Sequence, residues 1–437
     1  MPSKYLPPEI RRAGLVDIFP AQRLQWAVAE ASRCLMCEDP PCQQGCGAAV
    51  DIKRFIRALK GRNLRGAVAA VRDGNFLVAS CGRVCPQGEL CEKRCSATGL
   101  DRPIAIGELQ RFVGENAIRE RMRPVFPEPT SRSQVAIVGA GPAGLSAAFY
   151  LLQLGIVPDI FEPRSQLGGT PRVGIPRFRL PREILDAETS FVSDAGIRVV
   201  SEKVTDLEAL LDRYRAVFLG CGLGEAKRLG VPGENLEGVI QADELLEQVN
   251  LAPQPRPLDG VTVVLGGGNT ALDVATTAVR LGSQKVILAY RRSEAEMPAW
   301  AEHRQFALEE GIEIRVLLLP VEILGRAGKV VGVRVQQAKL GEPDLSGRRQ
   351  AVPVDNAFSV IECQQVIPAL GNGPSQAWRA AGLSIGPHGI EAHPETMATS
   401  RERVFAGGDL VRGGATVVQA VADGRRAARA IERLLMS

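Results

Sequence analysis

The chain has 437 residues and a mass of 46.8 kDa, which predicts about three domains at roughly 100–200 residues each. Apolar residues make up 45% and charged residues 23%, as in packed globular proteins, so a disordered chain or a coiled-coil rod is excluded. A net charge of +4, from 53 basic and 49 acidic residues, is too small to indicate nucleic acid or an anionic membrane as the main partner.

Features of export and of histidine-rich metal sites are missing from the sequence. No apolar run approaches the roughly 18–20 residues that span a bilayer, and residues 1–9 lack the apolar core of a signal peptide. We therefore expect a cytoplasmic protein whose thiols stay reduced. The three histidines, His303, His388 and His393, are too few for a histidine-rich metal site.

The first 125 residues are predicted to form a separate helical head that is rich in cysteine. Eight of the ten cysteines lie between Cys34 and Cys95. Apolar residues at helical spacing predict helices over residues 22–33, 51–60, 64–72 and 106–119. Residues 121–133 contain three prolines and no periodicity, which is typical of a linker.

The eight clustered cysteines form two groups, Cys34-x2-Cys37-x4-Cys42-x3-Cys46 and Cys81-x3-Cys85-x5-Cys91-x3-Cys95. This pattern favours two iron–sulfur clusters with ligands interleaved between the groups. Structural zinc and disulfides are the alternatives. Basic residues between the groups indicate a solvated helix face or a docking surface for an acidic partner; they are Lys53, Arg54, Arg57, Lys60, Arg62 and Arg65.

A first dinucleotide fingerprint, Gly139-Ala140-Gly141-Pro142-Ala143-Gly144, follows the head. It lies between a predicted strand at residues 135–138 and a predicted helix at 142–154, with the next strand at 158–161. The glycines permit a tight turn, approach of a pyrophosphate and close helix–strand packing. Glu162 ends the second strand, where a carboxylate accepts ribose hydroxyls.

A second fingerprint, Gly266-Gly267-Gly268-Asn269-Thr270-Ala271, begins 127 residues after the first. Its strands are predicted at 261–265 and 285–290, around a helix at 270–281. The second strand leads into Arg291 and Arg292 and carries no acidic residue, so this domain should prefer NADPH, whose 2′-phosphate arginines bind. The alternatives are that these are surface arginines, and that Asp273 is a buried polar group tied to nearby backbone.

A closing motif, Val404-Phe405-Ala406-Gly407-Gly408-Asp409, precedes a predicted helix over residues 416–435 whose N-terminus would meet a flavin. Alternation of strands and helices predicts an α/β fold with two Rossmann-like domains after the helical iron–sulfur domain. The expected boundaries are 1–125 for the head, 132–247 with 372–437 for a discontinuous FAD domain, and 248–371 for the NADPH domain.

Several long motifs resemble one family of electron-input flavoproteins. The chain is similar to the small (beta) subunit of NADPH-dependent glutamate synthase and to the flavoprotein part of dihydropyrimidine dehydrogenase. The motifs that carry the resemblance are Ser32-Arg33-Cys34-Leu35-Met36-Cys37, Cys81-Gly82-Arg83-Val84-Cys85-Pro86, the Gly139–Gly144 loop, Gly174-Ile175-Pro176-Arg177-Phe178-Arg179-Leu180-Pro181, Tyr290-Arg291-Arg292-Ser293, Met297-Pro298 and Ala406-Gly407-Gly408-Asp409. Gly47 departs from the family, which usually has proline there.

The resemblance implies FAD, NADPH and two [4Fe–4S] clusters. It implies that Cys34, Cys37, Cys42 and Cys95 hold one cluster, and that Cys46, Cys85, Cys91 and Gln110 hold the other. The alternative to Gln110 is Cys81. The residues predicted to bind the nucleotides are Gly139, Gly141, Pro142, Ala143, Gly144, Glu162, Gly169, Arg179, Gly408, Asp409, Thr416, Gly266, Gly268, Asn269, Thr270, Arg291, Arg292 and Gly371.

The implied function is electron input from NADPH through FAD and the clusters to a larger, FMN-containing catalytic subunit, most like the glutamate synthase small subunit. A dihydropyrimidine dehydrogenase flavoprotein subunit is the alternative, and a zinc-stapled, non-enzymatic NADPH-binding regulator is a distant one. A disulfide reductase would need a redox pair beside the flavin, whereas Cys221 and Cys363 are isolated and predicted to be buried. No acid–base residue is predicted, because hydride transfer needs none.

Overall fold

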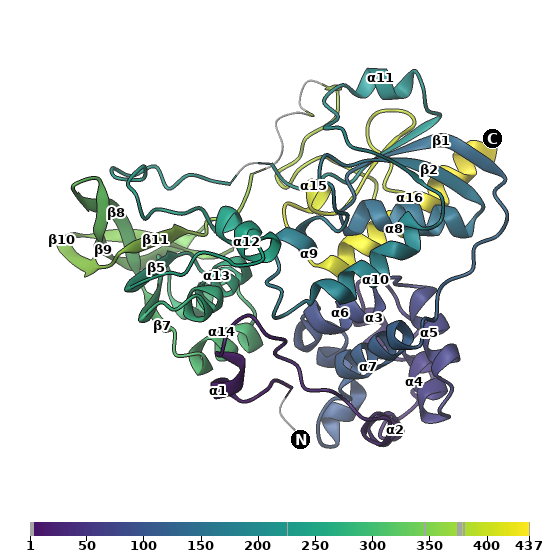
Figure 1. Ribbon diagram of the computed structural model, residues 1–437, viewed down its shortest axis with the longest axis horizontal. Coiled ribbons are helices and arrows are strands. Elements are labelled where there is room, and N and C mark those ends of the chain that lie inside the picture. Colours follow the sequence, from purple (N-terminus) through teal and green to yellow (C-terminus); the bar gives the residue numbers. More distant parts are fainter. Residues whose placement is uncertain (1–3, 225, 345–346, 374–377, 379–380, 437) are drawn as a thin grey trace. The chain divides into compact units, whose positions relative to one another are not determined.

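The computed structural model describes residues 4–224, 226–344, 347–373, 378 and 381–436, which divide into two compact units (Figure 1). The first unit contains Met1–Pro20, Val173–Phe178 and Ala226–Asn372, and the second contains Ala21–Arg172, Arg179–Glu225 and Gly373–Ser437. Among the described residues, no helix combines the length and the apolar character that crossing a bilayer requires.

The cysteine-rich head of the second unit is helical, as predicted. Its helices are α2 (Leu24–Ser32), α3 (Pro41–Gly45), α4 (Ile52–Lys60), α5 (Leu64–Arg72), α6 (Val78–Val84) and α7 (Ile106–Arg119). Asp51 caps α4 by accepting a hydrogen bond from the Arg54 backbone at 2.9 Å. Buried Ile52, Phe55 and Leu59 recur along one face of α4, which explains why spacing alone located this helix.

The rest of the second unit is built on a five-stranded parallel sheet with the order β12-β4-β1-β2-β3. Its strands are β1 (Ser131–Val138), β2 (Ile156–Phe161), β3 (Arg198–Val200), β4 (Ala216–Leu219) and β12 (Val404–Ala406), and its helices are α8 (Pro142–Gln153), α9 (Thr170–Val173), α10 (Arg182–Ser193), α11 (Leu207–Leu211), α15 (Asp409–Arg412) and α16 (Val417–Met436). The strand order reverses between β1 and β4, where ligands of such sheets bind.

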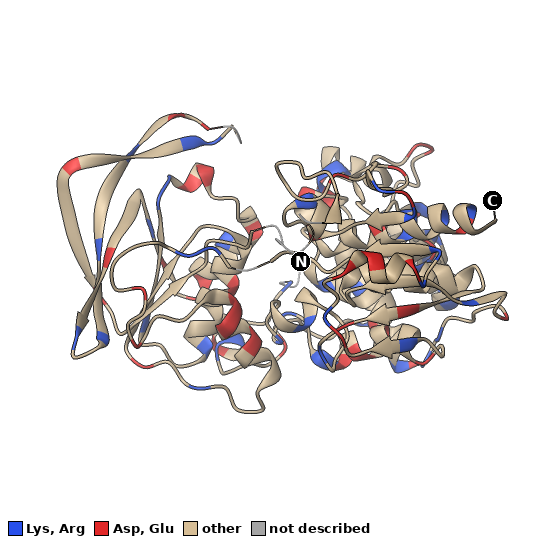
Figure 2. Ribbon diagram, turned by 90° about the horizontal axis from the view of Figure 1, so that it is seen from above, with Lys and Arg blue, Asp and Glu red and all other residues tan. Residues whose placement is uncertain are grey.

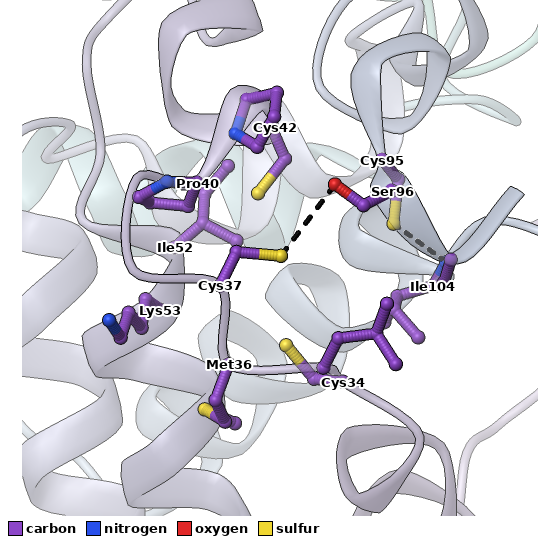
Figure 3. A pocket seen from close by; sticks show the side chains of 13 residues that line it. Cys34, Met36, Cys37, Pro40, Cys42, Ile52, Lys53, Cys95, Ser96 and Ile104 are labelled. Atoms are coloured by element: carbon purple, nitrogen blue, oxygen red, sulfur yellow. Dashed lines mark hydrogen bonds between the residues drawn. The ribbon is translucent and has the colours of Figure 1, made fainter. Parts of the chain in front are cut away.

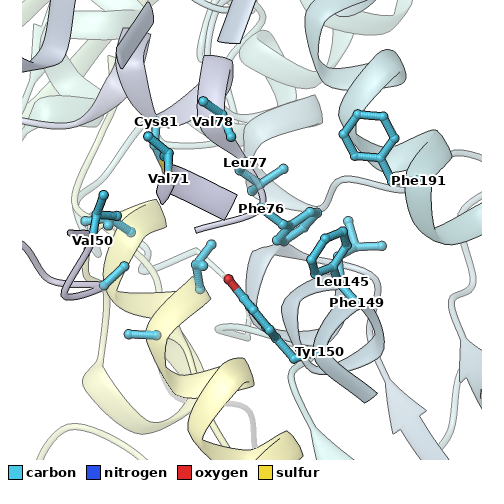
Figure 4. Packing of buried hydrophobic residues seen from close by; sticks show 14 of the residues in the cluster. Val50, Val71, Phe76, Leu77, Val78, Cys81, Leu145, Phe149, Tyr150 and Phe191 are labelled. Atoms are coloured by element: carbon cyan, nitrogen blue, oxygen red, sulfur yellow. The ribbon is translucent and has the colours of Figure 1, made fainter. Parts of the chain in front are cut away.

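The head and this sheet share one hydrophobic core, shown in Figure 4. Phe76 of the head stacks on Phe149 of α8, with ring centroids 5.0 Å apart. The Tyr150 hydroxyl donates to the Arg72 carbonyl oxygen at 2.9 Å. Because buried apolar surface and hydrogen bonds cross this boundary, the head is fixed against the sheet.

The first unit combines a parallel sheet of order β11-β5-β6-β7 with an antiparallel sheet of order β10-β9-β8. The strands are β5 (Val261–Leu265), β6 (Lys285–Tyr290), β7 (Glu313–Val316), β8 (Leu318–Arg326), β9 (Lys329–Pro343), β10 (Arg349–Glu362) and β11 (Gln365–Pro368), and the helices are α1 (Pro8–Arg11), α12 (Ala242–Leu251), α13 (Asn269–Arg280) and α14 (Ala301–Glu309). Ala327 and Gly328, with φ of 52° and 80°, form the tight turn that joins β8 to β9.

The division into units differs from the expected boundaries, because residues 4–20 pack on the first unit rather than on the cysteine-rich head. Arg11 is buried and pairs with Glu310 and, at 2.7 Å, with Glu309. Residues 173–178 also join the first unit, since the Asn250 side chain of α12 hydrogen-bonds the backbone of this segment. Leu229, Val231, Leu236 and Val239 pack on the core of the antiparallel sheet, and α12 packs on α13, so residues 226–247 belong to the same unit.

Candidate functional site

Four thiols surround one cavity in the head, shown in Figure 3. They belong to Cys34, Cys37, Cys42 and Cys95, and their sulfur atoms point toward the enclosed space. The Ile104 backbone N–H donates to the Cys95 sulfur at 3.4 Å. The structure therefore brings together the first predicted ligand set, including a cysteine that is 53 residues beyond the others.

The remaining thiols form a second, more deeply placed group. Cys81 and Cys91 are buried, and the Cys85 thiol has a raised pKa because it hydrogen-bonds Cys81, is buried, and lies near Cys46 and Cys91. The Cys46 thiol is close enough to Arg425 of α16 for the positive charge to lower its pKa, against a larger increase caused by burial. This group thus lies on the side of the head that faces α16.

Both candidates for the eighth ligand lie on or against α6. Cys81 is on α6, and the Gln110 amide group donates to the Val78 carbonyl oxygen at 3.0 Å. Helices α6 and α7 approach closely because Gly82 leaves room for the Arg111 backbone; an added Cβ would lie 2.5 Å from the Arg111 nitrogen. The Gln110 amide oxygen remains as its potential ligand atom.

The chemistry of the thiols fits a bound cluster better than a single ion. All ten cysteines are free thiols, and no three His, Cys, Asp or Glu side chains in the described ranges converge on one ion position. Zinc draws its ligands to about 2.0–2.3 Å from one point, whereas these thiols line a space. Burial raises the pKa of Cys42 to about 11, so binding of a metal group, which needs thiolates, must release protons.

A buried carboxylate ties α6 to the sheet part of the second unit. Glu188 of α10 accepts hydrogen bonds from the backbone of Ala79 at 2.7 Å and of Ser80 at 3.0 Å, at the start of α6. Burial raises the pKa of Glu188 to about 7, although these bonds and the charge of Arg72 oppose the increase. Glu188 therefore positions the helix that carries Cys81.

Glu188 should titrate near neutrality. Because its pKa in the folded chain lies above the ordinary value of 4.5, the stability that it contributes is fully present below pH 4.5 and is lost as the pH rises to about 7. The loss amounts to about 3 kcal/mol by the pKa difference. We expect an infrared carboxylic acid band with a midpoint near pH 7 that is missing in Glu188→Gln. A band absent already at pH 5 would contradict this expectation.

The first glycine loop has the geometry of a nucleotide site. Gly139 has a φ of 95°, and a Cβ on Gly144 would collide with the Gly139 carbonyl oxygen. Glu162 is buried and its carboxylate accepts the Ala140 backbone N–H at 2.8 Å, so it holds the loop. Gly169 packs on Gly141, where an added Cβ would lie 2.6 Å from the Gly141 Cα.

The closing motif meets this loop through small residues. Gly408 has a φ of 70°, and an added Cβ would lie 3.0 Å from the Cβ of Ala143. Asp409 accepts the Ala415 backbone N–H at 2.9 Å, and the Thr416 hydroxyl donates to Gln419 at 2.8 Å at the start of α16. Figure 1 shows α16 lying along α8, which places these motifs beside the loop. Arg179 is half-buried in the same unit.

The second glycine loop joins β5 to α13 in the first unit, and β6 beside it leads into the two arginines. Arg291 is exposed, whereas Arg292 is buried and pairs with Asp344 at 2.5 Å. Gly268 and Thr270 are accessible at the start of α13. Gly371 follows β11 with a φ of 77° in the same unit, and its carbonyl oxygen accepts the Lys227 backbone N–H.

One sequence-based interpretation is wrong and another gains a partner that the sequence did not mark. Asp273 is buried, as one alternative held, and its carboxylate lies 3.3 Å from the side chain of His303, which belongs to no motif. Cys221 is exposed instead of buried, and its sulfur accepts the Trp378 indole N–H at 3.2 Å. Cys363 is buried as expected, in the other unit.

Two basic residues of α4 have different surroundings. Arg54 pairs with Asp73 at 2.5 Å, and Lys53 lines the thiol cavity in Figure 3. Figure 2 shows basic and acidic segments interspersed through both units.

Two family models match consecutive parts of the chain. Residues 12–122 match "dihydropyrimidine dehydrogenase domain II, 4Fe-4S cluster", and residues 133–424 match "pyridine nucleotide-disulphide oxidoreductase". The predicted fold class, an iron–sulfur head followed by nucleotide-binding α/β domains, is confirmed.

Relatives in several organisms match nearly the whole chain. The glutamate synthase [NADPH] small chain of Halomonas elongata is 35% identical over 97% of this chain and 94% of its own length. The NAD-dependent dihydropyrimidine dehydrogenase subunit PreT of Escherichia coli is 35% identical, with 96% and 97% covered. The NADP(+)-dependent formate dehydrogenase subunit beta of Moorella thermoacetica is 38% identical over 90% of this chain, which spans 60% of that relative's length.

Solved structures share the fold. FprA of Mycobacterium tuberculosis in complex with NADPH superposes with a TM-score of 0.60 at 20% identity, over 71% of this chain and 85% of FprA. Thioredoxin reductase of Lactococcus lactis gives a TM-score of 0.55 at 20% identity, over 70% of this chain and 99% of the reductase.

Proposed function

Because the chain belongs to the family that contains the glutamate synthase [NADPH] small chains, we propose that it oxidises NADPH and delivers the electrons to a larger partner subunit. When bound, FAD accepts a hydride and two [4Fe–4S] clusters carry single electrons onward. The single observation that carries this proposal is the hydrophobic core that the cysteine-rich head shares with the five-stranded parallel sheet, here called the flavin-type sheet.

The order of the two thiol groups supports a direction of electron flow. The group with Cys46 and Cys85 is next to α10 and α16 of the flavin-type sheet, through Glu188 and Arg425. The other group lines a cavity beside Leu35, which is 48% exposed. Electrons would therefore enter at the deeper group and leave from the group near the surface.

The role of the chain's own residues is to bind the two nucleotides and to orient them. The N-terminus of α8, with the open space beside Gly141, accommodates the pyrophosphate of FAD, and Glu162 holds the loop in place. The N-terminus of α13 has the same role for NADPH, with Arg291 at the 2′-phosphate. No acid or base is required of the protein in the hydride step.

Gln110 is proposed as the eighth ligand, and two variants separate it from Cys81. Gln110→Ala should lose iron and alter the EPR spectrum of one cluster, while Cys81→Ser should keep both, because Cys81 would serve only as a hydrogen-bond partner of Cys85. Iron analysis and EPR of the reduced proteins measure this. Loss of iron in Cys81→Ser with an unaltered Gln110→Ala would reverse the assignment.

Replacing Arg291 should weaken NADPH binding, whereas replacing Arg292 should lower the stability of the fold. Arg291→Ala should raise the KM for NADPH about 10- to 100-fold, the value of one charge-assisted contact, and leave that for NADH unchanged. Arg292→Ala should instead lower the thermal midpoint, since it removes the ion pair between the buried Arg292 side chain and the Asp344 carboxylate. Steady-state kinetics with both nucleotides, and thermal melts, measure the two effects. Equal changes for NADPH and NADH in Arg291→Ala would place the phosphate site elsewhere.

The partner is proposed to be a larger FMN-containing catalytic subunit, most like the glutamate synthase large subunit. The matched relatives are named as subunits of glutamate synthase, dihydropyrimidine dehydrogenase and formate dehydrogenase. The test is anaerobic reconstitution with a glutamate synthase large subunit. NADPH-dependent glutamate formation in the mixture would support the proposal. Its absence, with uracil reduction on adding a dihydropyrimidine dehydrogenase barrel subunit, would favour the alternative.

A further inference from the structure

A buried polar chain lies directly behind the second glycine loop. Asn269 is the first residue of α13, and its Oδ1 accepts the Trp300 backbone N–H at 3.2 Å. The same oxygen lies 3.1 Å from Nδ1 of His303. The other ring nitrogen, Nε2, lies 3.3 Å from Oδ1 of Asp273. His303 and Asp273 are 6% and 5% exposed, so both groups are inside the first unit.

The partners of His303 determine its protons. The Asn269 oxygen already accepts a backbone N–H, so the amide cannot be turned round, and Nδ1 of His303 must donate to it. Nε2 lies 3.3 Å from Oδ1 of Asp273, which places this carboxylate at the opposite edge of the ring. The proton on Nδ1 therefore joins His303 to Asn269, and Asp273 lies against the other nitrogen.

The other charged side chains of α14 are directed elsewhere. Glu302 pairs with Lys4 at 2.6 Å, and Arg304 donates to the Ala299 carbonyl oxygen and lies 3.9 Å from Glu294. Asp273, on α13, is the carboxylate that lies 3.3 Å from the ring of His303.

Residues 296–303 also contact the second glycine loop directly. The Ala299 backbone N–H donates to the Gly267 carbonyl oxygen at 3.1 Å. The Tyr290 ring lies against Gly267, where an added Cβ would collide with it, and the Tyr290 hydroxyl donates to the Glu296 carbonyl oxygen at 2.9 Å. Residues 296–303 thus form a fixed support on which the orientation of Asn269 depends.

We propose that His303, held by Asp273, is a positioning residue that fixes the Asn269 side chain so that its amide N–H groups are presented as donors to a phosphate of the bound dinucleotide. With Oδ1 occupied on the protein side, Nδ2 is the part of this half-exposed side chain that remains for a ligand. The inference rests on the proposed NADPH site and adds two residues, His303 and Asp273, that do not touch the nucleotide.

The protonation of His303 is measured without nucleotide. The chain has three histidines, and His388 and His393 are exposed, so imidazole ¹⁵N NMR resolves the residues individually. We expect the ring of His303 to carry a proton on Nδ1, with signals that disappear in His303→Gln and persist in the control His388→Gln. A His303 ring protonated on Nε2 alone would overturn the inference.

The role of the network is measured by calorimetric titration with NADP⁺. We expect His303→Gln and Asn269→Ala each to bind about tenfold more weakly, the value of one hydrogen bond to a charged group. The double variant should bind no more weakly than Asn269→Ala, because both changes remove the same contact. Asp273→Asn, which keeps the shape, should show the same direction of change, and His388→Gln should bind normally.

The possible failures are distinguishable. If the two losses of NADP⁺ affinity multiplied in the double variant, or if His303→Gln bound NADP⁺ normally, the positioning role would be overturned. Either result would leave the NADPH site intact. If the unmodified chain gave no heat with NADP⁺, the proposed function would fail first, whatever the NMR spectrum of His303 showed, and the role of Asn269 toward a nucleotide would fail with it.

Discussion

The Gly141→Ala protein is expected to fold normally without FAD and to bind FAD about 10- to 100-fold more weakly than the unmodified chain, as overpacking by 1–3 kcal/mol implies. Gly141 has a φ of −78° and a ψ of −177°, which alanine adopts without strain. An added methyl group would meet only atoms 3.9 Å away. The methyl group therefore takes space from the pyrophosphate and from nothing in the protein.

Two matched variants sharpen this expectation. Gly144→Ala should lose both stability and FAD, because its methyl group collides with the Gly139 carbonyl oxygen. Gly268→Ala in the second loop, where an added Cβ meets nothing within 4 Å, should keep FAD and bind NADPH more weakly. Thermal melts of the apoproteins and flavin fluorescence titrations measure these effects. Full FAD affinity in Gly141→Ala would place the pyrophosphate away from this loop.

Replacement of Cys95 by serine should interrupt the path to the partner and leave the flavin reaction intact. Cys95 shares the surface-near cavity with Cys34, Cys37 and Cys42, and a serine oxygen does not replace a thiolate. We expect about half the iron to be lost, in proportion to one of two proposed clusters. NADPH oxidation with a dye that accepts electrons from flavin should continue, and electron delivery to the partner subunit should stop.

The matched control is Cys363→Ala, which removes a buried thiol far from either group in sequence. It should retain all iron and the full rate of delivery to the partner. Iron analysis, dye reduction and partner reduction are compared side by side. If Cys95→Ser delivered electrons normally, the group near the surface would not be the exit.

Local sequence patterns were sufficient to predict elements that are determined by residues close together in the chain. Helix α4 was predicted because its apolar residues repeat at helical spacing, and both glycine loops were predicted because a turn, a pyrophosphate and a helix each require a glycine at a definite position. The grouping of Cys95 with Cys34 came from family resemblance, since spacing left the partners of each thiol open.

What sequence reasoning missed depends on contacts between distant segments. The pairing of Arg11 with Glu310 joins residues 4–20 to the first unit, and neither residue marks this contact locally. Strand β10 of the antiparallel sheet is exposed or half-exposed at all but one position, so it lacks the alternation of buried and exposed residues that identifies strands. Asp273 and His303 are 30 residues apart and belong to no motif, so only the fold shows that they meet behind Asn269.

The most direct test of electron flow through this protein is an anaerobic titration of the unmodified chain, loaded with FAD and iron, with NADPH. We expect the flavin absorbance at about 450 nm to be bleached and EPR signals of reduced iron–sulfur clusters to follow, because hydride enters one cofactor and single electrons leave through the other. Bleaching without EPR signals, or an unchanged visible spectrum, would contradict electron flow from the nucleotide to the cysteine-rich head.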